Sequence, residues 1–345
     1  MLGHGYTSRY QTFDNQPAPN IMSLNPEHSS RGAMTTDSSR PAIGVIGLGI
    51  MGSLYARHLL DAAFTVTGYD VSAERLQSFR EAGGHVAESA AEVVERSDVV
   101  LTALSSITAF RSVLLDPDGA SARARAGQIF IETGTIPIDL KTQARGHLQQ
   151  HGAKMIDAPV TGTRVHAERK DLVVYGSGDE ADFVAARPII EAFARNVRFV
   201  GSFGAGMKLK IVTNLLVAVH NVAAAEALAL AKTAGLDLRL VYDLINGGAA
   251  GSVAFGFRGL LMVEGRFNEP TMRMDVFSKD LDIIDDFAST LHAATPLFQS
   301  SVLVYRNALA QGMKTEDVSA VFEILSAASG NLPPAVQPSL SKALI

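Results

Sequence analysis

Two polar side chains in an otherwise apolar stretch have the spacing needed for proton transfer. Lys210 and Asn214 are four residues apart in the segment GAGMKLKIVTN (204–214), and a helix would place both on one face. Burial lowers the pKa of a lysine because desolvation disfavours the ammonium, and such an amine can exchange a proton with a substrate hydroxyl near neutral pH. Asn214 could hold the same oxygen in line. The alternative is a solvent-exposed lysine near a helix start, which describes Lys208 equally well.

A glycine-rich run, Gly-Leu-Gly-Ile-Met-Gly at 47–52, has the spacing of a dinucleotide-binding loop. Its first glycine permits a tight turn, the second lets backbone approach a pyrophosphate, and the third allows close packing of helix on strand. The phosphates would lie at the start of the following helix. A plain glycine-rich turn between strand and helix is the alternative. The cofactor-binding residues predicted from this run are Gly47, Gly49, Ile50, Met51 and Gly52.

An acidic residue follows at the distance expected for recognition of the adenosine ribose. Asp70 ends an apolar run about 20 residues after the glycines, and its carboxylate could accept hydrogen bonds from the ribose hydroxyls. A carboxylate there would repel a 2′-phosphate, so NAD is favoured over NADP. Arg75 is the residue that argues for NADP. Alternatively, Asp70 or Ser72 only caps the next helix.

Short apolar runs alternate with helical stretches from residue 41 to residue 203. This pattern predicts an α/β fold with a Rossmann-type, doubly wound parallel sheet covered by helices on both faces. The expected helices between the early strands are 53–63, 73–82, 89–96 and 138–151. The expected strands are 42–49, 64–70, 98–104, 128–134, 154–160, 171–178 and 197–201, of which 171–178 could be antiparallel.

The sequence after residue 203 indicates helices only. We therefore predict a dinucleotide-binding domain at 41–203 and an all-α C-terminal domain at 204–330, with a disordered extension at 1–40 and a frayed tail at 331–345. The expected helices are a long apolar one reaching about residue 234, followed by 238–246, 252–261, 276–290, 296–310 and 317–328.

Composition excludes several classes of protein. The chain has 345 residues, a net charge of −5 and 47% apolar residues, so nucleic acid or an anionic membrane is not expected as the main partner. Without cysteine it cannot form a disulfide framework or a thiolate metal site. No group of His, Asp and Glu has convincing metal-ligand spacing, so no metal is predicted.

Two further expectations concern location. The apolar stretch 211–231 is long enough to span a membrane, but it contains Asn214, His220 and Asn221, so we expect a helix buried on most sides, with His220 as a core residue. Residues 1–40 lack the pattern of an export signal, which favours a cytoplasmic protein. A further hypothesis is that translation starts at Met34, and N-terminal sequencing that finds Met1 would exclude it.

Four motifs occur in the order found in one enzyme family. They are GLGIMG (47–52), DAPVTG (157–162), GAGMKLKIVTN (204–214) and FSKDL (277–281), within a match that spans about residues 42–328. The sequence resembles the β-hydroxyacid dehydrogenases, the 3-hydroxyisobutyrate dehydrogenase-like family, and its second half is most similar to the L-threonate dehydrogenase branch. The resemblance implies an NAD-dependent oxidoreductase that acts on a small hydroxy acid and forms a homodimer or homotetramer.

The resemblance also implies roles for single residues. It makes Lys210 the general acid/base and Asn214 its partner at the reacting hydroxyl, and it places Lys279 near the nicotinamide. Without it, Lys279 and Asp280 would be interpreted as a solvated ion pair. Other positions match the family's ligand contacts: Thr161, Gly162 and Thr163 at the substrate carboxylate, and Leu104, Ser105 and Thr135 beside the nicotinamide ribose.

Several positions depart from the family pattern. Thr163 stands where the family commonly has glycine, Gly134 where serine is usual, Ser105 where proline is usual, and Lys170-Asp171 where a Gly-Thr or Gly-Ser pair is usual. The substrate pocket therefore departs more than the cofactor site. The alternatives are an imine reductase, a 6-phosphogluconate-type enzyme and a non-catalytic NAD-binding module. Lys210 argues against the imine reductase, and Lys210 with Asn214 argues against the non-catalytic module. A 6-phosphogluconate-type enzyme would need a basic phosphate-binding cluster and a longer helical domain, and the sequence shows neither.

Overall fold

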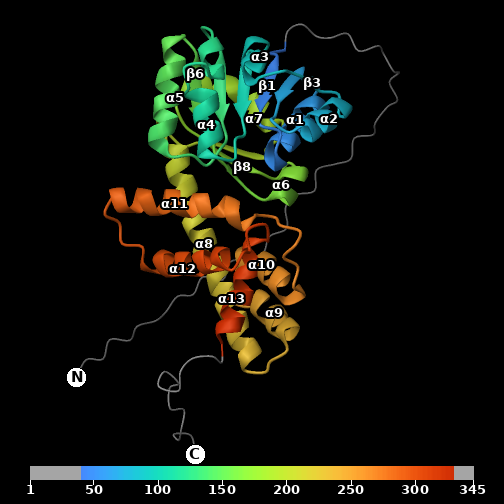
Figure 1. Ribbon diagram of the computed structural model, residues 1–345, viewed down its shortest axis with the longest axis vertical. Helices are drawn as coiled ribbons and strands as arrows, with labels where there is room; N and C mark the ends of the chain where they lie inside the picture. Colours follow the sequence, from blue (N-terminus) through green and yellow to red (C-terminus); the bar gives the residue numbers. More distant parts are fainter. Residues whose placement is uncertain (1–39, 330–345) are drawn as a thin grey trace, which may run out of the picture. The chain divides into compact units, whose positions relative to one another are not determined.

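A computed structural model describes residues 40–329, which lie within one compact unit (Figure 1). The expectations for the extension at 1–40 and the tail at 331–345 concern residues outside this range, Arg40 excepted, and so does the start at Met34. Strands occur only up to residue 199, and residues 205–329 contain helices. The division into domains at 203/204 stays a prediction.

A six-stranded, wholly parallel sheet forms the first part of the fold, as the alternating pattern predicts. The strand order is β3-β2-β1-β4-β5-β6. From β1 the chain adds β2 and β3 on one side of the sheet and then β4, β5 and β6 on the other side. Such a reversal of strand order is where doubly wound sheets bind ligands. The strands are β1 (Ile43–Ile46), β2 (Val66–Tyr69), β3 (His85–Val86), β4 (Val99–Thr102), β5 (Ile129–Glu132) and β6 (Lys154–Asp157).

Alternate residues of these strands enter two separate cores, one on each face of the sheet. Val45 packs with α1 and α7, whereas its neighbour Ile46 packs with α3, α4 and α5. The sequence analysis did not identify β3, α4 or α7, although Asp179 caps the start of α7. The helices around the sheet are α1 (Ile50–Asp61), α2 (Ala73–Glu81), α3 (Ala90–Glu95), α4 (Ile107–Leu114), α5 (Ile138–Gln150) and α7 (Glu180–Glu191), with a 3₁₀ turn, η1 (Ala120–Arg123).

A second, three-stranded sheet contains β7 (Val160–Thr161), β8 (Val173–Gly176) and β9 (Asn196–Phe199). The single strand expected at 154–160 is wrong: β6 ends at Asp157 and β7 begins at Val160. Pro159 has no N–H to continue the ladder, and this explains the break. β8 pairs antiparallel with β7 and parallel with β9. A short helix, α6 (Arg164–Glu168), connects β7 to β8.

The remaining residues form helices around one long central helix, α8 (Ala205–Thr233), against which α9 to α13 pack. Gly204 starts this helix with φ +89°, a conformation that favours glycine. The other helices are α9 (Leu238–Asn246), α10 (Val253–Glu264), α11 (Met274–Thr290), α12 (Pro296–Ala310) and α13 (Val321–Ala328), with a 3₁₀ turn, η2 (Val318–Ala320).

Only one side of α8 is covered, and this corrects two expectations. The helix is not buried on most sides, because Val212, Leu216 and Leu230 are exposed. His220 is exposed as well and is not a core histidine. The neighbouring Asn221 is the buried residue, and its Nδ2 donates 2.9 Å hydrogen bonds to Tyr305 Oη and Val318 O.

Among residues 40–329, α8 is also the helix whose length and composition would allow it to cross a membrane. About 44% of its most apolar window is buried within the protein, and its covered face carries Lys210, Asn214 and Asn221. Such polar groups are costly in hydrocarbon, whereas here they have partners from neighbouring elements. On its covered face the helix packs against α9 to α13.

Candidate active site

Two glycines of the run between β1 and α1, Gly47 and Gly52, lie where a side chain would not fit. Gly47 has φ +94°, and a Cβ on Gly52 would lie 1.8 Å from the carbonyl oxygen of Gly47. A Cβ on Gly49 would meet nothing closer than 3.9 Å, so open space lies in front of this backbone. The turn therefore has the close packing and the exposed backbone that a dinucleotide pyrophosphate requires. Ile50 is exposed at the helix start, and Met51 packs against the core.

Asp70, directly after β2, holds the glycine turn from the side. Its Oδ2 accepts from Leu48 N at 2.8 Å, and its Oδ1 accepts from Ser72 N at 2.9 Å. Arg75 Nη1 lies 3.3 Å from both carboxylate oxygens. The cap of α2 is Ser72, which accepts from Arg75 N, so capping is not the main role of Asp70. The aspartate is thus positioned beside the glycine turn, and its charge is balanced by Arg75.

The ends of β4 and β5 meet the glycine turn. Leu104 lies 3.4 Å from the Cβ position of Gly47 and, through its carbonyl oxygen, 3.2 Å from that of Gly134. Thr135, beside Gly134, accepts a hydrogen bond through its carbonyl oxygen from Lys279 Nζ at 2.5 Å. Ser105 is exposed. These contacts bring the residues assigned to the nicotinamide ribose next to the glycine turn and to α11.

Lys210 and Lys208 differ sharply in their surroundings. Lys210 is 9% exposed, whereas Lys208 is exposed, so the alternative of a solvated lysine does not hold for Lys210. Burial lowers the pKa of Lys210 to about 8; Asp280 raises this pKa and Lys279 lowers it, both to a lesser extent. An amine with this pKa is divided between its neutral and charged forms near neutral pH, and can therefore accept or donate a proton.

Asp280 connects the polar residues of this cluster. Its Oδ1 accepts from Lys279 Nζ at 2.7 Å, and its Oδ2 accepts from Asn214 Nδ2 at 2.9 Å. Lys279 and Asp280 are only 18% and 13% exposed, so they are not a solvated pair. Asp280 engages one N–H of Asn214 Nδ2, so Asn214 Oδ1 remains as an acceptor and the second N–H as a donor for a ligand. The sequence analysis assigned no role to Asp280, although it lies in the FSKDL motif.

A buried carboxylate fixes the start of the helix that carries Lys210. Asp157 Oδ2, at the end of β6, accepts from Met207 N at 2.8 Å and from Ser177 Oγ at 3.0 Å, and Gly206 N donates to Ser177 Oγ at 2.9 Å. Lys141 Nζ donates to Asp157 Oδ1 at 2.7 Å, and neither side chain of this ion pair is exposed. Lys210 is less than one helical turn after Met207, so this contact sets its position.

The residues predicted at the substrate carboxylate lie on a separate segment. Thr161 Oγ1 is buried and has no hydrogen-bond partner within residues 40–329, and Gly162 has φ +139°. Thr163 caps α6, and its Oγ1 lies 2.8 Å from His166 Nδ1. In the part of the chain that the structure describes, no hydrogen bond joins these three residues to Lys210 or Lys279. Pro159 approaches the start of α8 at Gly206, which brings the segment to the helix that bears Lys210.

The same described range contains no cluster of three or more potential metal ligands. A glycine cradle at the switch point of a Rossmann-type sheet, combined with a buried lysine nearby in the fold, is typical of NAD(P)-dependent oxidoreductases.

Comparisons with known proteins give the family. Residues 42–201 match the model of the NAD-binding domain of 6-phosphogluconate dehydrogenase, and residues 204–325 match that of the NAD-binding domain of NADP-dependent 3-hydroxyisobutyrate dehydrogenase. The chain is 36% identical to L-threonate dehydrogenase of Cupriavidus necator over 82% of this chain and 95% of the relative. It is 30% identical to mitochondrial 3-hydroxyisobutyrate dehydrogenase of Mus musculus, over 84% of this chain and 88% of the relative.

A solved structure agrees with these matches. The crystal structure of 3-hydroxyisobutyrate dehydrogenase from Salmonella typhimurium has a TM-score of 0.76 and 33% identity, and the match covers 82% of this chain and 99% of the other. The chain belongs to the 3-hydroxyisobutyrate dehydrogenase-like family of NAD(P)-dependent β-hydroxyacid dehydrogenases. Imine reductases that match at 18–21% identity share the fold only.

Proposed function

We propose that the protein oxidises a small hydroxy acid reversibly with NAD and that Lys210 is the general acid/base. The observation that carries this proposal is the buried amine of Lys210, whose pKa is lowered to about 8 beside Asn214 and Asp280. When bound, the nicotinamide ring supplies the hydride acceptor. In the oxidation direction neutral Lys210 Nζ accepts the proton of the substrate hydroxyl, and in the reduction direction the charged amine returns it.

The surrounding residues orient this proton transfer. Asn214 Oδ1 is available to a substrate hydroxyl because Asp280 fixes the amide through Nδ2. Lys279 is held between Thr135 O and Asp280, which supports its placement beside the nicotinamide. Thr161 Oγ1, a buried hydroxyl without a hydrogen-bond partner among residues 40–329, supports binding of the substrate carboxylate, and the adjacent Gly162 belongs to the same proposed site. Thr163 contributes less, because His166 already engages its hydroxyl.

The cofactor preference follows from Asp70. Gly47, Gly49 and Gly52 would accommodate the pyrophosphate, and Asp70 would face the ribose with its charge close by. Arg75 pairs with both oxygens of Asp70, so it offers little uncompensated positive charge to a 2′-phosphate. We therefore propose NAD over NADP, although the family model that matches residues 204–325 is described as NADP-dependent.

Assembly and location form part of the same proposal. The exposed apolar side chains Leu209, Val212 and Leu216 lie on one face of α8 and support a homodimer or homotetramer in contact through this helix. Light scattering that finds a monomer at micromolar concentration would exclude this assembly.

A cytoplasmic location is supported by the bacterial relatives and by the packing of α8 against the other helices, and cell fractionation tests it.

The substrate is tested with a panel of hydroxy acids. Purified protein is mixed with NAD or NADP and with L-threonate, 3-hydroxyisobutyrate or a related acid, and reduced cofactor is followed by its absorbance. We expect turnover with at least one of these acids, L-threonate first, since several relatives with 31–36% identity carry that name. We also expect kcat/KM about tenfold or more in favour of NAD, because Asp70 repels the 2′-phosphate.

Two outcomes would contradict the proposal. Tight NAD binding without turnover of any acid in the panel would indicate the non-catalytic module instead. A preference for NADP would exclude the role given to Asp70 and would point to Arg75 as the residue that binds the phosphate.

A further inference from the structure

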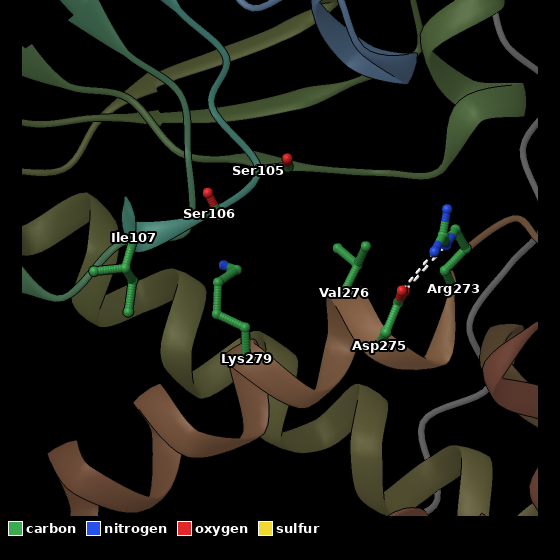
Figure 2. A pocket seen from close by; sticks show the side chains of 7 residues that line it. All are labelled: Ser105, Ser106, Ile107, Arg273, Asp275, Val276 and Lys279. Carbon is green, nitrogen blue, oxygen red and sulfur yellow. Dashed lines mark hydrogen bonds and ion pairs between the residues drawn. The ribbon is translucent and has the colours of Figure 1, made fainter. Parts of the chain in front are cut away.

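A pocket of about 440 Å³ opens between the loop after β4 and the first turns of α11 (Figure 2). This volume lies in the range of small-molecule sites. The loop contributes hydroxyl groups, and α11 with its cap residue contributes the cations Arg273 and Lys279 against the one carboxylate of Asp275, so the lining carries a net positive charge that suits an anion. The lining residues are Ser105, Ser106, Ile107, Arg273, Asp275, Val276 and Lys279.

The guanidinium of Arg273 has N–H groups that its ion pair with Asp275 does not use. Its Nε donates to Asp275 Oδ1 at 3.0 Å and its Nη2 donates to Asp275 Oδ2, so the two groups form a bidentate ion pair (Figure 2). A guanidinium carries five N–H groups, and the side chain of Arg273 is 42% exposed. Within residues 40–329 the side chain has no other partner, so three N–H groups remain for a ligand. Asp275 therefore orients the guanidinium without using all of its donors.

The backbone that carries Arg273 is rigidly held. Arg273 caps α11 and forms a β-bridge with Asp317, and Met274 N donates to Glu316 O at 3.0 Å. The carboxylate of Asp317 is fully buried and accepts from Thr271 N at 2.8 Å and from Arg258 Nη1 at 2.5 Å. A cation on such a fixed segment loses little conformational freedom when it binds a ligand.

The pocket lies along the cofactor site. Leu104 contacts the glycine turn at Gly47, and the next residue, Ser105, lines the pocket. At the other end, Lys279 lines the pocket and bonds to Thr135 O. The pocket therefore adjoins the glycine turn through the loop after β4 and the proposed nicotinamide site through Lys279. The hydroxyl of Ser106 accepts from Ala109 N at 3.1 Å and keeps its own proton to donate.

We propose that Arg273, oriented by Asp275, binds phosphate oxygens of the dinucleotide pyrophosphate from the α11 side of this pocket, with Ser105 and Ser106 as further donors. The inference rests on the proposed use of NAD(P) and extends it, because it adds a cofactor contact from the helical part of the chain. Arginine suits this role because its planar N–H groups match the geometry of phosphate oxygens.

The test is direct measurement of binding, without turnover. Titration calorimetry with ADP-ribose, which carries the pyrophosphate but no nicotinamide, and fluorescence titration with NADH are compared for wild type, Arg273→Ala and Arg273→Lys. We expect Arg273→Ala to weaken both ligands about tenfold and Arg273→Lys to weaken them less, since a single charge-assisted contact changes affinity on this order. Arg306→Ala removes a similarly exposed arginine, paired with Asp282, and serves as the control that leaves binding unchanged.

A second variant separates phosphate binding from a merely structural ion pair. Asp275→Asn breaks the same pair but keeps the guanidinium, so we expect ADP-ribose to bind at least as tightly as to wild type. Equal weakening by Asp275→Asn and Arg273→Ala would overturn the proposal, as would unchanged binding in Arg273→Ala. Competition by inorganic phosphate at equal concentration would indicate a free-phosphate site instead and would also overturn it. Failure of the wild type to bind ADP-ribose and NADH would instead contradict the proposed function.

Discussion

Replacement of Lys210 with methionine is expected to lower kcat by about 10²–10⁴-fold, the usual contribution of a general acid or base. Methionine fills the buried site but cannot carry the proton. NADH binding should stay within a few-fold of wild type, because the cofactor contacts proposed here come from the glycine turn, Asp70 and α11. The rate is followed by cofactor absorbance with saturating substrate, and binding by fluorescence titration.

Two further variants make this test specific. Lys210→Arg keeps the positive charge, but arginine does not lose its proton at accessible pH, so this variant should be as inactive as Lys210→Met. Lys208→Met changes an exposed lysine two residues away and should retain activity. Appreciable turnover by Lys210→Arg would show that the site needs a charge and not a proton acceptor.

The largest expected loss of stability comes from the ion pair beneath the start of α8. Lys141→Met would leave the carboxylate of Asp157 buried without its cation, and this should lower the free energy of unfolding by about 3–5 kcal/mol. Burial raises the pKa of Glu132 in the same region, and Lys141 partly offsets this effect, so the variant removes the cation from two buried carboxyl groups. Urea denaturation followed by circular dichroism measures the change.

The exposed pair of Lys154 and Asp182 provides a matched control. The Lys154 side chain is 48% exposed, so Lys154→Met should leave the free energy of unfolding nearly unchanged. The double variant Lys141→Met, Asp157→Asn removes both charges and should recover part of the stability that the single variant loses. If Lys141→Met costs no more than Lys154→Met, the buried pair does not fix this region.

Local patterns were sufficient to predict much of the fold. The alternation of apolar runs and helical stretches gives the parallel order of the larger sheet, because strands buried on both faces require continuous apolar runs. The helices at 238–246 and 296–310 lie where the sequence places them, since Gly and Pro separate them from their neighbours. The two-residue strand β3 has no such signal and forms through pairing with β2.

Properties set by tertiary packing could not be predicted in the same way. The sequence near Lys208 and Lys210 does not show which lysine is buried, and only the packing of α8 distinguishes them. For the same reason the sequence does not show that His220 is exposed and Asn221 is buried, because this depends on which side of the helix is covered. The role of Asp280 depends on contacts over 66 residues of sequence, which no local spacing reveals.

The pH dependence of kcat/KM in both directions tests the central role of Lys210 most directly. Burial lowers the pKa of this amine to about 8, and oxidation requires the neutral form, so the rate of oxidation should fall about tenfold per pH unit below 8 and level off above it. Reduction requires the charged form and should fall above pH 8 instead. In Lys210→Met the residual rates should lose both inflections. Profiles that stay flat from pH 6 to 10 in the wild type, or an inflection near pH 8 that persists in Lys210→Met, would contradict this mechanism.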